Sequence, residues 1–299
     1  MKRMLLVLTI IFILATGCTS KAPEEKGVLN IGLMPAVDTA PIFLAQENGY
    51  FEELNLEVNI QIFTNAQDRQ SALQTGSIDG AMTDLVALAT NVNGGFQMKA
   101  TTLTDGMFIL LANEGAKDKT EIKVGMMEIS VSNFLVDQWL SEYDVEKVYI
   151  NAIPGRLEAV VTNQLDMGLL PEPIASVGVL QGLEKIVYEP VDGFSPDVMA
   201  FTQKTIDEKS NALLAFHKAY NKAVKDLQAD ENLAREVIIG NIPNMNEKLK
   251  DMMNLPTYHE ARLPDDAYLN KIIEWTNGVI GETMNVSADD LIDKQFVNK

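Results

Sequence analysis

Short apolar segments alternate with helical segments along the first part of the chain. Residues 56–63 alternate apolar and polar side chains with period two, which is typical of a strand. The segment before it opens with Pro41 and ends at Gly49, as helices commonly do. This order predicts a parallel sheet covered by helices. In strand-helix-strand-helix-strand order, the expected elements are residues 28–34, 41–50, 56–63, 66–75 and 77–82.

A second stretch of sequence repeats this pattern. Residues 159–166 align with residues 72–79, and both octapeptides end in an aspartate that follows an apolar residue. A helix that turns directly into a buried strand needs one residue with positive φ, and Gly76 and Asn163 are residue types that tolerate it. We therefore expect two duplicated α/β lobes, the alternative being a chance similarity of two α/β units.

After residue 200 the pattern becomes helical, with Pro243, Pro256 and Pro264 separating the segments. Two α/β lobes followed by a helical tail predict a discontinuous first lobe, with the tail packed on it. The chain is expected to cross between the lobes near residues 110–113 and to return near residues 199–202. Two crossings form a hinge, and a hinge between α/β lobes favours closure on a ligand. The expected lobes are residues 28–111 plus 201–299 for lobe 1 and residues 112–200 for lobe 2.

The first residues indicate export from the cytoplasm. Two basic residues precede an apolar run at residues 4–14 that is too short to span about 30 Å of hydrocarbon. Small residues then lead to Cys18, an arrangement that resembles a bacterial lipobox, in which the cysteine is lipidated. The alternative is an ordinary secretory signal with a chance cysteine. We expect an extracytoplasmic protein anchored to the membrane through Cys18, with a signal peptide at residues 1–17 and a tether at residues 18–27.

Composition narrows the functional classes. The formal net charge is −18, which disfavours binding to nucleic acid. One cysteine excludes an intramolecular disulfide, an iron–sulfur cluster and a multi-cysteine zinc site, and two histidines exclude a His-rich metal site. No Gly-rich phosphate loop is present. We therefore expect no cofactor, no metal and no catalytic residue.

Candidate ligand-binding residues lie where the expected strands end, because ligands of open parallel sheets bind beyond the carboxyl ends of the strands. Several are helix-capping residue types, and the alternative for each is a cap without a ligand. The acidic members suit a solute with an amine or amide, while helix N-termini suit an anionic group. Arg69 lies one turn into a helix, and its direction stays open. The expected binding residues are Asp38, Thr39, Asn65, Ala66, Thr83, Asp84, Ser130, Ser132, Asn133, Arg156 and Glu172.

Several motifs together resemble the solute-binding proteins of ABC importers in the nitrate, sulfonate and taurine group, which are related to thiamine-precursor-binding proteins. The resemblance covers about residues 28–225. It implies a type II periplasmic-binding-protein fold, a ligand cleft between the lobes, and delivery to a membrane permease driven by a cytoplasmic ATPase. The motifs are Ile-Gly at 31–32, AQENGYF at 45–51, ALQTGSID at 72–79, Leu-Asp at 165–166 and Pro-Glu-Pro at 171–173.

The chain also departs from parts of this group. The loop at residues 35–39 lacks the tryptophan-containing pattern of pyrimidine binders, and no cysteine follows Cys18 to match the Cys-rich motif of a related enzyme. The chain is also shorter than nitrate and bicarbonate receptors. We expect a monomeric receptor for a small polar organic solute, either sulfonate- or taurine-like or an amino-bearing heterocycle. The alternatives are a ligand-sensing lipoprotein that signals to a membrane partner and an enzyme on the same scaffold.

Overall fold

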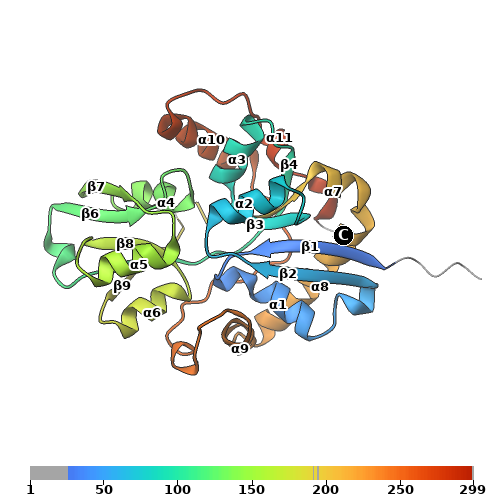
Figure 1. Ribbon diagram of the computed structural model, residues 1–299, viewed down its shortest axis with the longest axis horizontal. Helices are drawn as coiled ribbons and strands as arrows, with labels where there is room; N and C mark the ends of the chain where they lie inside the picture. Colours follow the sequence, from blue (N-terminus) through green and yellow to red (C-terminus); the bar gives the residue numbers. More distant parts are fainter. Residues whose placement is uncertain (1–25, 191, 194, 298–299) are drawn as a thin grey trace, which may run out of the picture.

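The computed structural model describes residues 26–190, 192–193 and 195–297, which form two α/β lobes side by side (Figure 1). The expected signal peptide and Cys18 lie outside these residues. Within the described part of the chain, no helix combines the length and the apolar character that crossing a bilayer requires.

The first lobe is built on a five-stranded sheet with the order β2-β1-β3-β10-β4. Strand β1 pairs in parallel with β2 and β3, whereas β10 runs antiparallel to β3 and β4. The sheet is mixed because β10 enters from the other lobe in the opposite direction. These strands are β1 (Gly27–Leu33), β2 (Leu56–Ile62), β3 (Gly80–Asp84), β4 (Met98–Leu103) and β10 (Asp197–Thr202).

The second lobe repeats this plan in the order β7-β6-β8-β5-β9, with β5 antiparallel to β8 and β9. The duplication extends to the turns that precede the third strand of each unit. Gly76 has φ 71° and Asn163 has φ 57°, so both adopt the predicted left-handed conformation. The strands are β5 (Phe108–Ala112), β6 (Glu121–Met126), β7 (Asp144–Tyr149), β8 (Met167–Pro171) and β9 (Glu184–Val187).

Helices cover the sheets, and the C-terminal helices pack on lobe 1 as expected. Helix α8 contacts α1, β1 and β2, and helices α10 and α11 contact α3 (Figure 1). The aromatic rings of Phe51 and Phe216 stack at 5.7 Å in this part of the core. The helices of the first two units are α1 (Ala40–Glu47), α2 (Ala66–Gln74), α3 (Leu85–Asn93), α4 (Val131–Trp139), α5 (Ile153–Val161) and α6 (Ile174–Leu180). The helices of the tail are α7 (Gln203–Glu208), α8 (Ser210–Ala229), α9 (Asn232–Asn241), α10 (Asp266–Ile280) and α11 (Ala288–Leu291).

The crossings between the lobes lie earlier in the chain than the sequence indicated. Strand β5, at residues 108–112, belongs to the second sheet, so the first crossing occupies residues 104–107 rather than 110–113. The return is complete before Asp197, where β10 begins in the first sheet, rather than near residues 199–202. Each crossing therefore leads into a strand that belongs to the sheet of the other lobe. The apolar pattern of such a strand does not reveal to which sheet it belongs.

Candidate functional site

A cavity of about 740 Å³, part of it open to solvent, lies between the lobes. Its walls come from the loops that follow β1, β3 and β6, from the first turns of α2 and α5, from residues 106–107 of the first crossing and from the start of β5. These are the carboxyl ends of the parallel strands, where the duplicated units turn toward each other. The cavity therefore receives residues from both lobes and from the hinge.

The wall formed by lobe 2 carries a buried guanidinium. Arg156, in the first turn of α5, is 3% exposed, and its Nη1 donates to the hydroxyl of Ser132 at 3.3 Å. Its Nε has no hydrogen-bond partner, and no ion pair neutralises it within the described chain. Burial lowers the pKa of Arg156 to about 10, so the group stays charged at neutral pH. Such a charge favours an anionic partner.

The N-terminus of the nine-residue helix α4 lies on the same wall. Ser130 caps this helix, and its hydroxyl accepts the backbone N–H of Ser132 at 3.1 Å. The hydroxyls of the two serines lie 2.7 Å apart. The positive end of the helix dipole reinforces the preference of Arg156 for an anionic group.

The wall formed by lobe 1 is acidic. Asp38 is 2% exposed and accepts a hydrogen bond from the hydroxyl of Thr104 at 2.6 Å. Burial raises its pKa to about 6. Asp197, at the start of β10, accepts a hydrogen bond from the hydroxyl of Ser195 at 2.6 Å, and burial together with the charge of Asp38 raises its pKa well above the ordinary value. Two neighbouring buried carboxylates favour a cationic or hydrogen-donating partner.

Asp84 and Arg69 complete the polar lining. Asp84 caps α3 by accepting the backbone N–H of Ala87 at 2.9 Å. Burial raises its pKa, while hydrogen bonding to backbone groups, including that of Val131 in the other lobe, opposes the shift. Arg69 donates to the hydroxyl of Thr83 at 2.9 Å, its Nε lacks a partner, and burial lowers its pKa. The Asp84 contact to Val131 shows that the two lobes meet at the cavity.

Between these charged ends the lining is apolar. Methionine side chains contribute from four different segments, and Phe108 contributes from the start of β5. Thioether groups are flexible and polarisable, and they pack well against flat or irregular apolar groups. The four methionines are Met34, Met82, Met107 and Met127. The cavity thus suits a small molecule with two polar ends and an apolar middle.

Most of the residues expected from the sequence line this cavity, although their role in binding stays a prediction. Three of the expected residues do not line the cavity. Thr39 donates to a backbone carbonyl three residues earlier, Asn65 caps α2, and Asn133 donates to a backbone carbonyl five residues earlier. Those that line the cavity are Asp38, Ala66, Thr83, Asp84, Ser130, Ser132 and Arg156.

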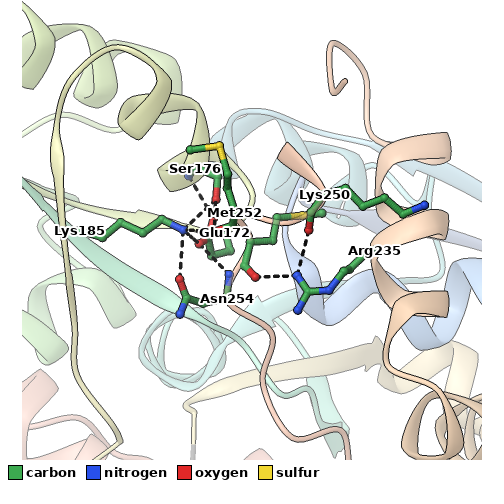
Figure 2. A network of polar contacts seen from close by, with 8 residues as sticks. Glu172, Ser176, Lys185, Arg235, Lys250, Met252 and Asn254 are labelled. Atoms are coloured by element: carbon green, nitrogen blue, oxygen red, sulfur yellow. Dashed lines mark hydrogen bonds and ion pairs between the residues drawn. The ribbon is translucent and has the colours of Figure 1, made fainter. Parts of the chain in front are cut away.

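Glu172 also lies outside the cavity, which corrects the expectation that it faces the solute. Its side chain is fully buried and accepts hydrogen bonds from Ser176, Lys185 and the backbone of Asn254 (Figure 2). The sequence placed Glu172 correctly at a strand end, but Lys185 on the same sheet draws the carboxylate away from the cavity.

Arg69 and Asp197 are cavity residues that the sequence analysis did not select. The signal for Arg69 was its position in the first turns of a helix that begins at the cavity. Asp197 had no comparable signal, because it reaches the cavity only through the pairing of β10 with β3. Among the described residues, no group of three His, Cys, Asp or Glu side chains is arranged to hold a metal ion.

The duplicated lobes and their shared cavity agree with a sequence match over residues 22–239 to the NMT1-like family. The chain belongs to the NMT1-like family. A Brachyspira hyodysenteriae protein named as an ABC transporter periplasmic binding protein is 21% identical over 264 residues, which cover 79% of this chain and 76% of that protein. The nitrate import ATP-binding protein NrtC of Synechococcus elongatus is 31% identical over 61 residues, which are 20% of this chain and span only 9% of the length of NrtC.

Solved structures show that this member of the NMT1-like family has the periplasmic-binding-protein fold. The ligand-binding component of an ABC-type import system from Staphylococcus aureus, with zinc bound, superposes with a TM-score of 0.78 at 15% identity, covering 90% of this chain and 97% of that one. The nitrate-binding protein NrtA of Synechocystis PCC 6803 gives a TM-score of 0.71 at 14% identity, covering 89% and 84%. The aliphatic sulphonate binding protein SsuA of Escherichia coli gives 0.66 at 12% identity, covering 87% and 95%.

Proposed function

We propose that this protein is the solute-binding component of an ABC importer and that it works outside the cytoplasm. The two-lobed fold, the family match and the names of its relatives support this assignment. The geometry adds a cavity that both lobes and the hinge line together. In this proposal the protein performs no bond-breaking step. It captures a solute by closure and presents it to a permease driven by a cytoplasmic ATPase.

The solute is proposed to be a small organic molecule with an anionic group at one end and an amine at the other. The single observation that carries this choice is the buried guanidinium of Arg156, which meets a hydroxyl but, within the described residues, no carboxylate. An anionic group of the solute would supply the missing partner, since charge-assisted hydrogen bonds are the strong ones in such sites. Taurine-like amino sulfonates and amino-bearing heterocycles with an acidic group fit this description.

The amine end is assigned to the lobe 1 wall. Asp38 and Asp197 are buried there, and the charge of Asp38 disfavours the ionised form of Asp197. A cationic nitrogen placed between them would relieve this repulsion. Because the anion site lies on lobe 2 and the amine site on lobe 1, one solute bridges the lobes and stabilises the closed form by its differential affinity.

A screen of small molecules against the purified protein tests the assignment. Amino sulfonates, amino acids, amino-bearing heterocycles and simple anions are compared by thermal unfolding, and a binder at about 100 times its dissociation constant adds about 2.7 kcal/mol of stability. We expect an amino-bearing anion to raise the melting temperature more than simple anions do. Mass spectrometry of molecules released by denaturation identifies a solute carried through purification. No shift with any class and no released molecule would argue against a solute receptor.

The membrane anchor is a separate part of the proposal. Lipidation of Cys18 would hold the protein at the membrane, because two or three acyl chains give stable anchoring. Expression with a labelled fatty acid should label the wild-type protein and not the Cys18→Ser variant. Equal labelling of the two would show that Cys18 is not the lipidation site.

A further inference from the structure

The segment at residues 250–255 lies between the two lobes (Figure 2). It follows α9 and belongs to the C-terminal part of the chain, which packs on lobe 1. Arg235 of α9 attaches this segment to lobe 1. Its Nη1 donates to the carbonyl oxygen of Lys250 at 2.9 Å and to that of Met253 at 2.8 Å. One side of the segment is thereby fixed to lobe 1.

The other side of the same segment is fixed to lobe 2. The ammonium of Lys185, on β9, donates to the carbonyl oxygen of Met252 at 2.5 Å and to the side-chain oxygen of Asn254 at 3.0 Å. Lys185 also pairs with Glu172, whose carboxylate accepts the backbone N–H of Asn254 at 3.0 Å. Ser176 on α6 adds a hydrogen bond to each of Glu172 and Met252.

The chain that follows this segment runs along the first crossing. The backbone N–H of His259 donates to Asp105 at 2.8 Å, and the guanidinium of Arg262 donates to the same carboxylate at 2.8 Å. The carbonyl oxygen of Arg262 accepts the backbone N–H of Leu103, at the end of β4, at 2.7 Å. Residues 250–262 therefore contact lobe 2, the first crossing and lobe 1 in turn.

We propose that residues 250–262 act as a third connecting segment of the hinge and that Lys185 and Glu172 are positioning residues that limit how far the lobes open. Glu172 and Lys185 both belong to lobe 2, and their side chains are 0% and 15% exposed, so pulling Met252 and Asn254 away would take hydrogen-bond partners from buried charged groups. These contacts, called the tie below, should therefore stay intact when the lobes separate. Because the tie acts on lobe closure, the proposal rests on the proposed function.

The contacts between lobes at α10 are of a different kind. The indole N–H of Trp275 donates to the exposed carboxylate of Asp137 on α4 at 3.0 Å, and the Trp275 ring meets Phe134 edge to face at 5.3 Å. Figure 1 shows α10 and α9 on opposite sides of the molecule. The hydrogen bond of Trp275 is exposed and easily replaced by water, whereas Phe134 is buried in an apolar cluster that both lobes share. Because the buried charged groups at the interface lie at the tied segment, we place the pivot there and the opening at the α4–α10 side.

The tie also reaches the loop that carries Asp38. The backbone carbonyl of Glu172 accepts the N–H of Val37 at 3.0 Å, and the backbone N–H of Glu172 donates to Met107 of the first crossing at 2.9 Å. Through its side chain and its backbone, Glu172 thus contacts the segment at residues 250–255, the first crossing and the loop that carries Asp38. Loosening the tie should lower the fraction of closed protein, and the measured affinity falls in proportion to that fraction.

Two variants weaken the tie at opposite ends. Lys185→Met removes the hydrogen bonds of the ammonium to Met252 and Asn254, while those of Ser176 and Glu172 to the segment remain. Arg235→Met removes the hydrogen bonds of the guanidinium to Lys250 and Met253 and leaves Glu172 and Lys185 paired. The control is Lys117→Met, which removes an exposed ion pair to Glu184 on the same strand as Lys185. Small-angle X-ray scattering of the solute-free proteins gives the radius of gyration. Calorimetry with the solute identified by the screen gives the dissociation constant.

We expect both variants to have a larger radius of gyration than the wild type and a dissociation constant roughly three- to tenfold higher. The Lys117→Met control should match the wild type. Should Lys185→Met not fold, Arg235→Met carries the test, because it leaves the buried pair in place. An unchanged radius in Arg235→Met would overturn the proposal, and so would a change in Lys185→Met alone. Scattering needs no solute, so this result stands apart from the outcome of the solute screen.

Discussion

The guanidinium of Arg156 lies 3.3 Å from the hydroxyl oxygen of Ser132, and within the described chain no carboxylate pairs with it. A folded protein gains nothing from an unpaired buried charge, since burial disfavours the charged form. Such a group persists where a partner arrives from outside the chain. The burial of Arg156 is therefore explained by solute binding and not by stabilisation of the fold.

Replacing Arg156 with methionine should weaken binding strongly without weakening the fold. The variant removes a charge-assisted contact whose loss typically costs about 2–5 kcal/mol of binding energy, so the dissociation constant should rise at least about 30-fold. Thermal stability of the solute-free protein should stay equal or rise, because a buried charge is removed. Calorimetry and thermal unfolding measure the two effects.

Two further variants make the Arg156 result specific. Arg156→Lys keeps the charge but loses the planar fork, so its affinity should lie between those of the wild type and the methionine variant. Lys123→Met removes an exposed cation from the same lobe and should bind like the wild type. Wild-type affinity in Arg156→Met would contradict the assignment of the anion site.

The affinity for an amine-bearing solute should fall in acid as Asp38 takes up a proton. Burial, with help from the charge of Asp105, raises the pKa of Asp38 from 3.8 to about 6, and burial together with the charge of Asp38 raises the pKa of Asp197. A cationic group of the solute stabilises the ionised carboxylate, so binding lowers this pKa and releases a proton. Dissociation constants measured from about pH 8 to about pH 5 should rise as the pH passes below about 6.

The variant Asp38→Asn provides the control for this pH dependence. It should bind weakly at neutral pH and lose most of the change near pH 6. In the solute-free protein, the raised pKa means that the folded state binds more protons than the unfolded state between about pH 4 and 6. The ionised group therefore costs on the order of 3 kcal/mol at neutral pH, and Asp38→Asn should raise the melting temperature more at about pH 7.5 than at about pH 4.5. An equal pH profile in the two proteins would refute the role of Asp38.

The duplicated lobes were predictable because short stretches of sequence contain the apolar pattern and the turn residues that form each α/β unit. Asp79 accepts the backbone N–H of Asn30 at 2.7 Å, and Asp166 accepts that of Lys123 at 2.8 Å in the second lobe. In both lobes this aspartate lies three residues after the left-handed turn. Its hydrogen bond links the start of the third strand to the first strand. Apolar periodicity and turn residues together determined these units.

The hinge and part of the site depend on contacts that no local pattern contains. The apolar strand at residues 108–112 has a composition that suits either sheet, and only its pairing assigns it to lobe 2. Glu172 meets Lys185 13 residues later and Asn254 82 residues later. Asp197 reaches the cavity by a pairing with β3 across more than one hundred residues. Strand ends predicted seven of the residues that line the cavity, whereas the partner that each side chain contacts depends on the tertiary structure.

A buried histidine should make the protein less stable in mild acid. The ring of His217 on α8 lies 3.0 Å from the hydroxyl of Thr101 on β4, and burial lowers its pKa to about 4. His217 is neutral in the folded state, whereas in the unfolded state it takes up a proton below about pH 6.5. Its contribution is complete above about pH 6.5 and decreases by about 2 kcal/mol by pH 5.

The variant His217→Gln isolates this contribution in urea unfolding at about pH 7 and about pH 5. The wild type should lose more unfolding free energy over this interval than the variant does, because the contributions of Asp38 and the other groups are common to both. The difference between the two losses is the quantity that reports His217. Equal losses in the two proteins would show that His217 does not control acid stability.

The glycine at the start of β3 should be required for close packing against β10 in the first sheet. A Cβ built on Gly80 would lie 2.2 Å from the ring of Phe201 on β10. Phe201 is fully buried and meets Phe216 edge to face at 5.7 Å, so its ring has little freedom to move away. Gly80→Ala should destabilise the protein by about 1–3 kcal/mol through overpacking.

In contrast, a Cβ on Gly278 of α10 meets nothing within 4 Å, so Gly278→Ala should add about 0.5–1 kcal/mol to the free energy of unfolding through helix propensity. Urea unfolding of both variants beside the wild type measures these opposite signs, and a stable Gly80→Ala protein would mean that the sheet adapts at β10.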